Sequence, residues 1–119
     1  MPLRILIADD DAAVRRALKH LLESQARWQV CGEAANGLEA VEKSAELKPD
    51  VVILDYEMPE MDGFEAARQI DSASPQMPIL IYSHFGGTPE IRLELKNVYN
   101  RGIISKNSPK ELLRALEAL

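Results

Sequence analysis

Side chains that can bind a metal ion or take part in group transfer follow the short apolar runs of this 119-residue chain. They are Asp9, Asp10 and Asp11 after the first run, and Asp55, Ser83 and Lys106 after later runs. A charge directly after a buried apolar run costs desolvation free energy unless another group pairs with it. Helix capping is the ordinary role for Asp11, but it does not explain Asp55, which follows the wholly apolar residues 51–54.

These residue types together point to phosphoryl chemistry. Asp9, Asp10 and Asp55 would repel one another if they lay close together, and they would resist joint ionisation. Mg²⁺ resolves this conflict, because it prefers oxygen ligands and binds through one or two carboxylates with water and phosphate. Lys106 adds a second positive charge, so the set can neutralise a phosphoryl group in transfer. An aspartate can itself attack phosphorus and form an aspartyl phosphate.

The elements that position these side chains are strands and helices in alternation. Short apolar runs predict five strands, at residues 5–8, 28–31, 51–54, 79–82 and 102–105. A helical pattern follows each strand, so five helices are expected. Such alternation indicates a parallel sheet covered on both faces, a doubly wound α/β domain. Functional groups of such sheets gather beyond the carboxyl ends of the strands.

Four helix starts carry a capping signal. Asp11 is expected to cap the first helix, and Thr88 with Pro89 is expected to start the fourth. Two capping boxes are predicted, Asn36 with Glu39 and Ser108 with Glu111, the second with Pro109 at the first helical position. The apolar residues expected in the second helix are Leu38, Val41 and Ala45.

Composition excludes several classes of protein. Lys and Arg total 14 and Asp and Glu total 19, a net charge of −5, so direct nucleic-acid binding by this domain is not expected. Cys31 is the single cysteine, which fits a small core residue and excludes an internal disulfide. No run approaches membrane-spanning length, and the start does not read as a signal peptide. We expect one cytoplasmic domain over residues 1–119.

Three segments together resemble the receiver domains of bacterial two-component response regulators. They are ILIADDD at 5–11, PDVVILDYEMPEMDG at 49–63 and SK at 105–106, in order and at family-like spacing. The resemblance implies a flavodoxin-like sheet of five parallel strands in the order 2-1-3-4-5 with five helices. It also implies a phosphorelay role, in which a sensor histidine kinase or phosphotransfer protein donates a phosphoryl group and the domain switches conformation to control an output domain or partner.

The resemblance also implies a role for each site residue. Asp55 would be the phospho-acceptor, Asp10 a direct Mg²⁺ ligand and Asp9 a ligand through water, with the backbone carbonyl of Glu57 completing the metal site. Ser83 would be the switch hydroxyl, and Lys106 would pair with the phosphate. The domain would catalyse only its own phosphorylation and dephosphorylation.

The kind of output domain that this receiver would control is expected from analogy with the family alone. Residues 108–116 look like receivers that precede a helix-turn-helix DNA-binding domain, which implies a role in transcription regulation. A phosphorylation-linked homodimer is a further expectation.

Three positions depart from the common family pattern. Ile103 stands where an aromatic switch residue is frequent, His84 where a small residue is usual, and Asn107 where many members have proline. None of these changes removes a phosphorylation residue. The first two keep open a receiver-like interaction module that works without phosphorylation.

Two other classes fit less well. A Mg²⁺-dependent phosphohydrolase would place its nucleophile after the first strand, which leaves Asp55 and its loop without a role. A flavin binder of flavodoxin type would need a hydroxyl- or glycine-rich loop where this chain has Asp9, Asp10 and Asp11.

Overall fold

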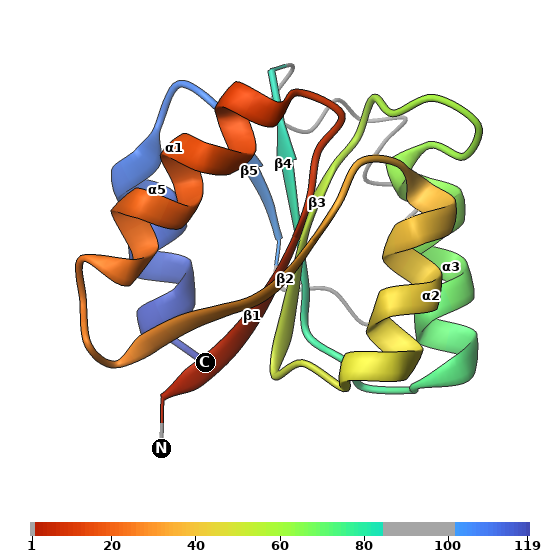
Figure 1. Ribbon diagram of the computed structural model, residues 1–119, viewed down its shortest axis with the longest axis horizontal. Coiled ribbons are helices and arrows are strands. Elements are labelled where there is room, and N and C mark those ends of the chain that lie inside the picture. Colours follow the sequence, from red (N-terminus) through yellow and green to blue (C-terminus); the bar gives the residue numbers. More distant parts are fainter. Residues whose placement is uncertain (1, 85–101) are drawn as a thin grey trace.

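The computed structural model describes residues 2–84 and 102–119 of the chain. Its elements alternate along the chain (Figure 1). They are β1 (Leu3–Ala8), α1 (Ala12–Glu23), β2 (Trp28–Ala34), α2 (Gly37–Leu47), β3 (Val51–Asp55), α3 (Gly63–Ala73), β4 (Ile79–Ser83), β5 (Ile103–Ser105) and α5 (Pro109–Glu117). Every expected strand is present. The described part of the chain contains four helices where five were expected; the helix expected from Thr88 lies outside it.

The five strands form one parallel sheet in the order β2-β1-β3-β4-β5. β3 and β4 are buried along their whole length, which explains why their sequences are almost wholly apolar. This arrangement confirms the flavodoxin-like, doubly wound α/β fold and its strand order. All five strands run in one direction, so their carboxyl ends lie together at the upper end of the sheet in Figure 1.

Helices cover both faces of the sheet. α1 and α5 lie on one face, and α2 and α3 lie on the other (Figure 1). Each side has its own apolar core, with Ile53 and Leu112 on the α1/α5 side and Leu54 and Phe64 on the α2/α3 side. Over residues 2–84 and 102–119, no helix is long and apolar enough to cross a membrane.

Three of the predicted helix caps lie within the described residues, and the structure confirms two of them. The Asp11 carboxylate accepts from the Ala13 N–H over 2.9 Å, which confirms the cap of α1. Asn36 accepts from the Glu39 N–H over 2.8 Å, which confirms the cap of α2. The expected side-chain cap at Ser108 is wrong. The Glu111 N–H, which the serine hydroxyl would have accepted, donates instead to the Ser108 carbonyl over 3.0 Å.

Two further expectations differ from the structure. β2 continues through Ala34, because residues beyond Cys31 pair with β1 after a shift of register. In α2, Val41 packs partly buried against the core, but Leu38 and Ala45 are exposed, and the buried residues are small ones, Gly37, Ala40 and Ser44. The reason is close approach, since a Cβ on Gly37 would lie 2.2 Å from the Met61 carbonyl oxygen.

Candidate functional site

The expected side chains meet at the carboxyl ends of four neighbouring strands. Asp9 and Asp10 follow β1, while Asp55 ends β3. Ser83 ends β4, and Lys106 directly follows β5. The Lys106 N–H donates to the Ser83 carbonyl over 2.9 Å, which continues the β4–β5 pairing past the end of the strand. The sheet itself therefore fixes where each of these side chains starts.

Lys106 lies between two buried carboxylates. Its Nζ is 2.8 Å from Asp9 Oδ2 and 3.2 Å from Asp55 Oδ1. The side chain of Lys106 is 8% exposed, and those of Asp9 and Asp55 are 2% and 6% exposed. Burying these charges carries a large desolvation cost, which the short contacts offset only while both signs are present. The cluster therefore carries two negative charges around one positive charge.

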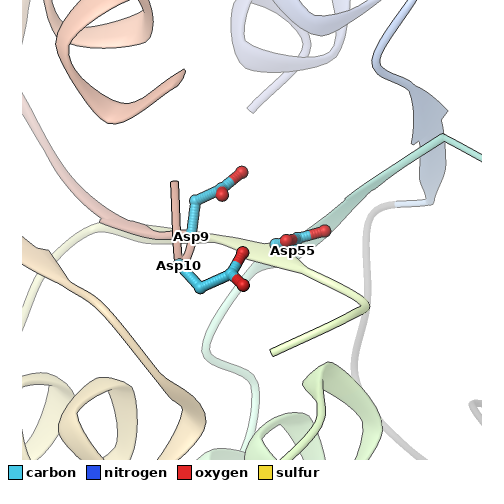
Figure 2. Close-up of side chains that lie close together, drawn as sticks. All are labelled: Asp9, Asp10 and Asp55. Atoms are coloured by element: carbon cyan, nitrogen blue, oxygen red, sulfur yellow. The ribbon is translucent and has the colours of Figure 1, made fainter. Parts of the chain in front are cut away.

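Asp10 adds a third carboxylate from the exposed side. Figure 2 shows Asp10 beside Asp9 at the end of one strand, with Asp55 next to them. One carboxylate oxygen from each residue can be chosen so that all three lie within 4.8 Å of one another. Three hard oxygen donors with excess negative charge fit a hard divalent cation such as Mg²⁺, which binds carboxylates and keeps several waters.

The surroundings raise the pKa of Asp55 to about 6. Burial is the main cause and the charge of Asp9 adds to it, while Lys106 and a hydrogen bond from the Glu57 N–H act in the opposite direction. The pKa of Lys106 is raised as well: burial alone would lower it, but hydrogen bonding and attraction to Asp9 and Asp55 exceed that effect. The lysine is therefore charged at neutral pH, and the Asp55 carboxylate is mostly ionised.

A pocket of about 220 Å³ opens over this cluster. It is lined by Asp9, Asp10, Asp11, Val14, Asp55, Glu57, Ser83, His84 and Lys106. The structure thus brings together every site residue expected from the sequence except Ile103. The side chain of Ile103 packs against the core on the α2/α3 side. His84 is exposed and lies at the mouth of the pocket.

A second, mostly apolar hollow of about 250 Å³ adjoins the first, between α1 and the start of α5. It is lined by Val14, Ala17, Leu18, Leu21, Tyr82, His84, Lys106 and Pro109. Val14, His84 and Lys106 line both hollows, so an apolar surface borders the charged pocket directly.

Sequence reasoning missed two residues that contact the site. Arg15 donates through Nη1 to the backbone carbonyl of Asp9 over 2.6 Å. The Tyr82 hydroxyl donates to the Lys106 carbonyl over 3.3 Å. Arg15 stands within a predicted helix and Tyr82 within a predicted strand, and neither carries a local motif. Only the packing of α1 and β4 against the site reveals these contacts.

Comparison with known proteins assigns the family. The family model described as the response regulator receiver domain matches residues 5–117 of the chain. The chain therefore belongs to the response regulator receiver domain family. It is a receiver domain of two-component phosphorelay signalling, with acidic residues clustered at its phosphorylation site. Receiver domains bind Mg²⁺ at an acidic pocket and interact with kinases and phosphotransfer proteins.

Individual relatives are chemotaxis proteins. The chain is 39% identical over 113 residues to the chemotaxis protein CheY of Thermotoga maritima, covering 95% of this chain and 93% of that relative. It superimposes on the response regulator domain of Thermotoga maritima CheB with a TM-score of 0.88 at 33% identity, covering 99% of this chain and 96% of that one.

A third relative is the protein-glutamate methylesterase/protein-glutamine glutaminase of Vibrio parahaemolyticus. It is 47% identical over 83 residues, which is 70% of this chain but 22% of that relative. Its enzymatic name therefore does not pass to this chain. The curated relatives named here are a chemotaxis protein and a methylesterase, so the expected helix-turn-helix output and role in transcription are not supported.

Proposed function

We propose that this receiver domain accepts a phosphoryl group on Asp55. The observation that carries the proposal is the buried Asp9–Lys106–Asp55 cluster at the strand ends, with Asp10 beside it. A plain structural role would not need three carboxylates around one lysine, because the excess negative charge costs stability. A site that receives a phosphoryl group and a cation needs that arrangement.

The transfer is a substitution at phosphorus. An oxygen of the ionised Asp55 carboxylate forms the new bond to phosphorus, while the bond from phosphorus to the donor breaks. The electron pair of that bond leaves with the donor, as the imidazole of a phosphohistidine or the carboxylate of an acyl phosphate. Lys106, already 3.2 Å from Asp55, pairs with the phosphoryl oxygens as charge builds on them.

Asp10 and Asp55 would hold Mg²⁺ directly, with Asp9 acting through water and the Glu57 carbonyl as a further ligand. The donor set fits, because one oxygen from each of the three carboxylates can be chosen so that all three lie within 4.8 Å of one another. The cation would neutralise charge on the phosphoryl oxygens. The residues of the chain contribute the fixed geometry and the excess negative charge that attracts the ion.

Ser83 and Ile103 are proposed to carry the response. Ser83 is buried in the pocket, where its hydroxyl can donate to a phosphoryl oxygen on Asp55. Ser83 pairs with Ser105 and Ile81 pairs with Ile103, so movement of the end of β4 is passed to β5. Ile103 then responds by a change in apolar packing. Gly86 and Gly87, which would give the segment after Ser83 the backbone freedom to move, lie outside the described residues.

The donor partner is proposed to be a sensor histidine kinase or phosphotransfer protein. The apolar hollow between α1 and the start of α5 supports this, because a partner helix seated there would bring its histidine to the charged pocket. We also propose one cytoplasmic receiver domain over residues 1–119 that catalyses only its own phosphorylation and dephosphorylation. Its output would pass to a partner protein or through a phosphorylation-linked homodimer.

The test is intact mass spectrometry after incubation with acetyl phosphate and Mg²⁺. The parent should gain one phosphoryl group, and Asp55→Asn should gain none. Asp50→Asn is the matched control, because the exposed Asp50 stands just before the opposite end of β3, and this variant should be labelled like the parent. Ser83→Ala should also be labelled. Failure to label the parent would favour the phosphorylation-independent interaction module, and equal labelling of Asp55→Asn would move the acceptor elsewhere.

A further inference from the structure

We infer that Arg15 is a positioning residue for the metal site, because it fixes the peptide that joins Asp9 to Asp10. The inference rests on the proposed function, since it assigns Mg²⁺ to the acidic pocket. The hydrogen bonds of Arg15 go to the backbone carbonyl of Asp9 and to Glu33, and not to the carboxylates of the acidic pocket. It acts through the backbone from which Asp10 projects.

The contacts of Arg15 use two sides of its guanidinium. Nη1 donates to the Asp9 carbonyl over 2.6 Å, and Nε donates to Glu33 Oε1 over 3.2 Å. The Arg15 side chain is 19% exposed, so it is held against the protein along most of its length. Glu33 thereby orients the guanidinium, and the guanidinium holds the carbonyl. A planar guanidinium held at two points gives up less freedom per hydrogen bond than a lysine would.

The backbone carbonyl of Asp9 accepts from Arg15, while the N–H and both carboxylate oxygens of Asp9 have other partners. The Asp9 N–H donates to Ala34 over 3.0 Å, Oδ1 accepts from the Asp11 N–H over 2.9 Å, and Oδ2 accepts from Lys106. The Asp9 carbonyl and the Asp10 N–H belong to one rigid peptide plane. Fixing that plane fixes the position of the Asp10 Cα, from which the exposed side chain projects.

The support for Arg15 comes from three elements. Arg15 lies on α1, its acceptor follows β1, and Glu33 lies near the end of β2. The Glu33 carbonyl in turn accepts from Lys43 Nζ on α2. Groups outside the ligand set that orient metal ligands commonly change metal affinity about tenfold or more when they are lost. We therefore expect Arg15 to set the affinity for Mg²⁺ without taking part in the transfer itself.

A pure charge effect and a positioning role predict opposite changes in Mg²⁺ affinity when Arg15 is replaced, so the test separates them. Removing a positive charge near an acidic pocket should strengthen Mg²⁺ binding if charge alone matters. Losing a positioning residue should weaken it. The neighbouring Arg16 is exposed and supplies a matched control, since Arg16→Met removes the same charge from the same helix. Any effect of charge alone should appear in that control.

The experiment measures Mg²⁺ affinity by amide chemical-shift titration, and the phosphorylation rate by acetyl phosphate against Mg²⁺ concentration. Arg15→Met should weaken Mg²⁺ binding about tenfold, while the rate at saturating Mg²⁺ stays within about twofold of the parent. Arg16→Met should bind Mg²⁺ as tightly as the parent or more tightly. Glu33→Gln, which keeps an acceptor oxygen but loses the charge, should show a smaller loss than Arg15→Met.

Three results would overturn the inference. These are unchanged or tighter Mg²⁺ binding in Arg15→Met, an equal loss in Arg16→Met, or a lost rate that saturating Mg²⁺ does not restore. If Arg15→Met does not fold, Arg15→Lys and Glu33→Gln decide the matter, and parent-like affinity in both would overturn it. A parent that binds Mg²⁺ but gains no phosphoryl group would defeat the proposed function, and the comparison of Mg²⁺ affinities would still stand.

Discussion

The ion pair of Lys106 with Asp9 and the ion pair of Arg27 with Glu117 have the same length, 2.8 Å, in opposite surroundings. The first is almost fully buried, and the second has side chains that are 52% and 48% exposed. At the surface, water screens the charges and would solvate either one alone. In the pocket, each charge depends on its partner. The two ion pairs have equal lengths but different consequences: the surface pair tolerates the loss of one partner, and the buried pair does not.

The largest expected effect comes from removing the buried cation. Lys106→Met leaves Asp9 and Asp55 facing each other without compensation, so the free energy of unfolding at pH 8 should fall by about 3 kcal/mol. Urea denaturation without Mg²⁺ measures it. The exposed Lys110 supplies the control, because Lys110→Met removes the same charge from the start of α5 and should change stability little. A loss in Lys106→Met as small as that in Lys110→Met would show that the buried pair does not differ from a surface pair.

Asp55→Asn tests the same cluster, but it should raise the free energy of unfolding, whereas Lys106→Met should lower it. Because burial and Asp9 raise the pKa of Asp55 to about 6, its ionised form destabilises the fold above that pH. Asparagine removes this cost, so the variant should be more stable than the parent by about 2 kcal/mol at pH 8. The advantage should shrink as the pH falls from 6 towards 4 and disappear below about pH 3, where the parent carboxyl is protonated in both folded and unfolded states. Urea denaturation of both proteins across this range measures the difference.

Mg²⁺ supplies the complementary control for that variant. It should stabilise the parent at pH 8 and stabilise Asp55→Asn less, because the variant has lost one of three carboxylates. A variant that is less stable than the parent at pH 8 would show that Lys106 more than compensates the cost of ionised Asp55.

The smallest effect is expected at the surface pair. Arg27 also lies over the Trp28 ring, 4.4 Å from its centroid, and donates to Gln25, so a single substitution would mix three interactions. A double-mutant cycle with Arg27→Ala and Glu117→Gln isolates the ion pair. Its coupling energy should be about 0.5 kcal/mol or less and should fall further in high salt. A coupling energy that approaches the effect of Lys106→Met would remove the contrast between the two pairs.

Much of the fold followed from the sequence because strands buried on both faces must be apolar. Residues 51–54 and 79–82 therefore stood out, and the side chains after them could be assigned to one edge of the sheet. Asp55 and Ser83 were placed in this way, and Lys106 was placed by the shorter run at residues 102–105. The strand order came from the family resemblance, since alternation alone does not specify it.

The misses share a cause, which is that they depend on contacts between elements. Leu38 is exposed, whereas its neighbour Gly37 lies so close to Met61 that no side chain fits there. Ser108 loses its capping role to its own carbonyl. Arg15 gains its contacts only when α1, β1 and β2 are assembled. No local pattern of residues reports any of these arrangements.

Lys106 lies 97 residues after Asp9, and the two are joined directly. During synthesis from the amino end, the acidic ends of β1 and β3 leave the ribosome well before this lysine. β1, β2 and β3 can pair once residue 55 has emerged, and the carboxylates then repel one another without their cation. That repulsion opposes early closure of the sheet. The short strand β5 and Lys106 are made after these carboxylates, so the repulsion is relieved only when the lysine joins them. The site is therefore completed last.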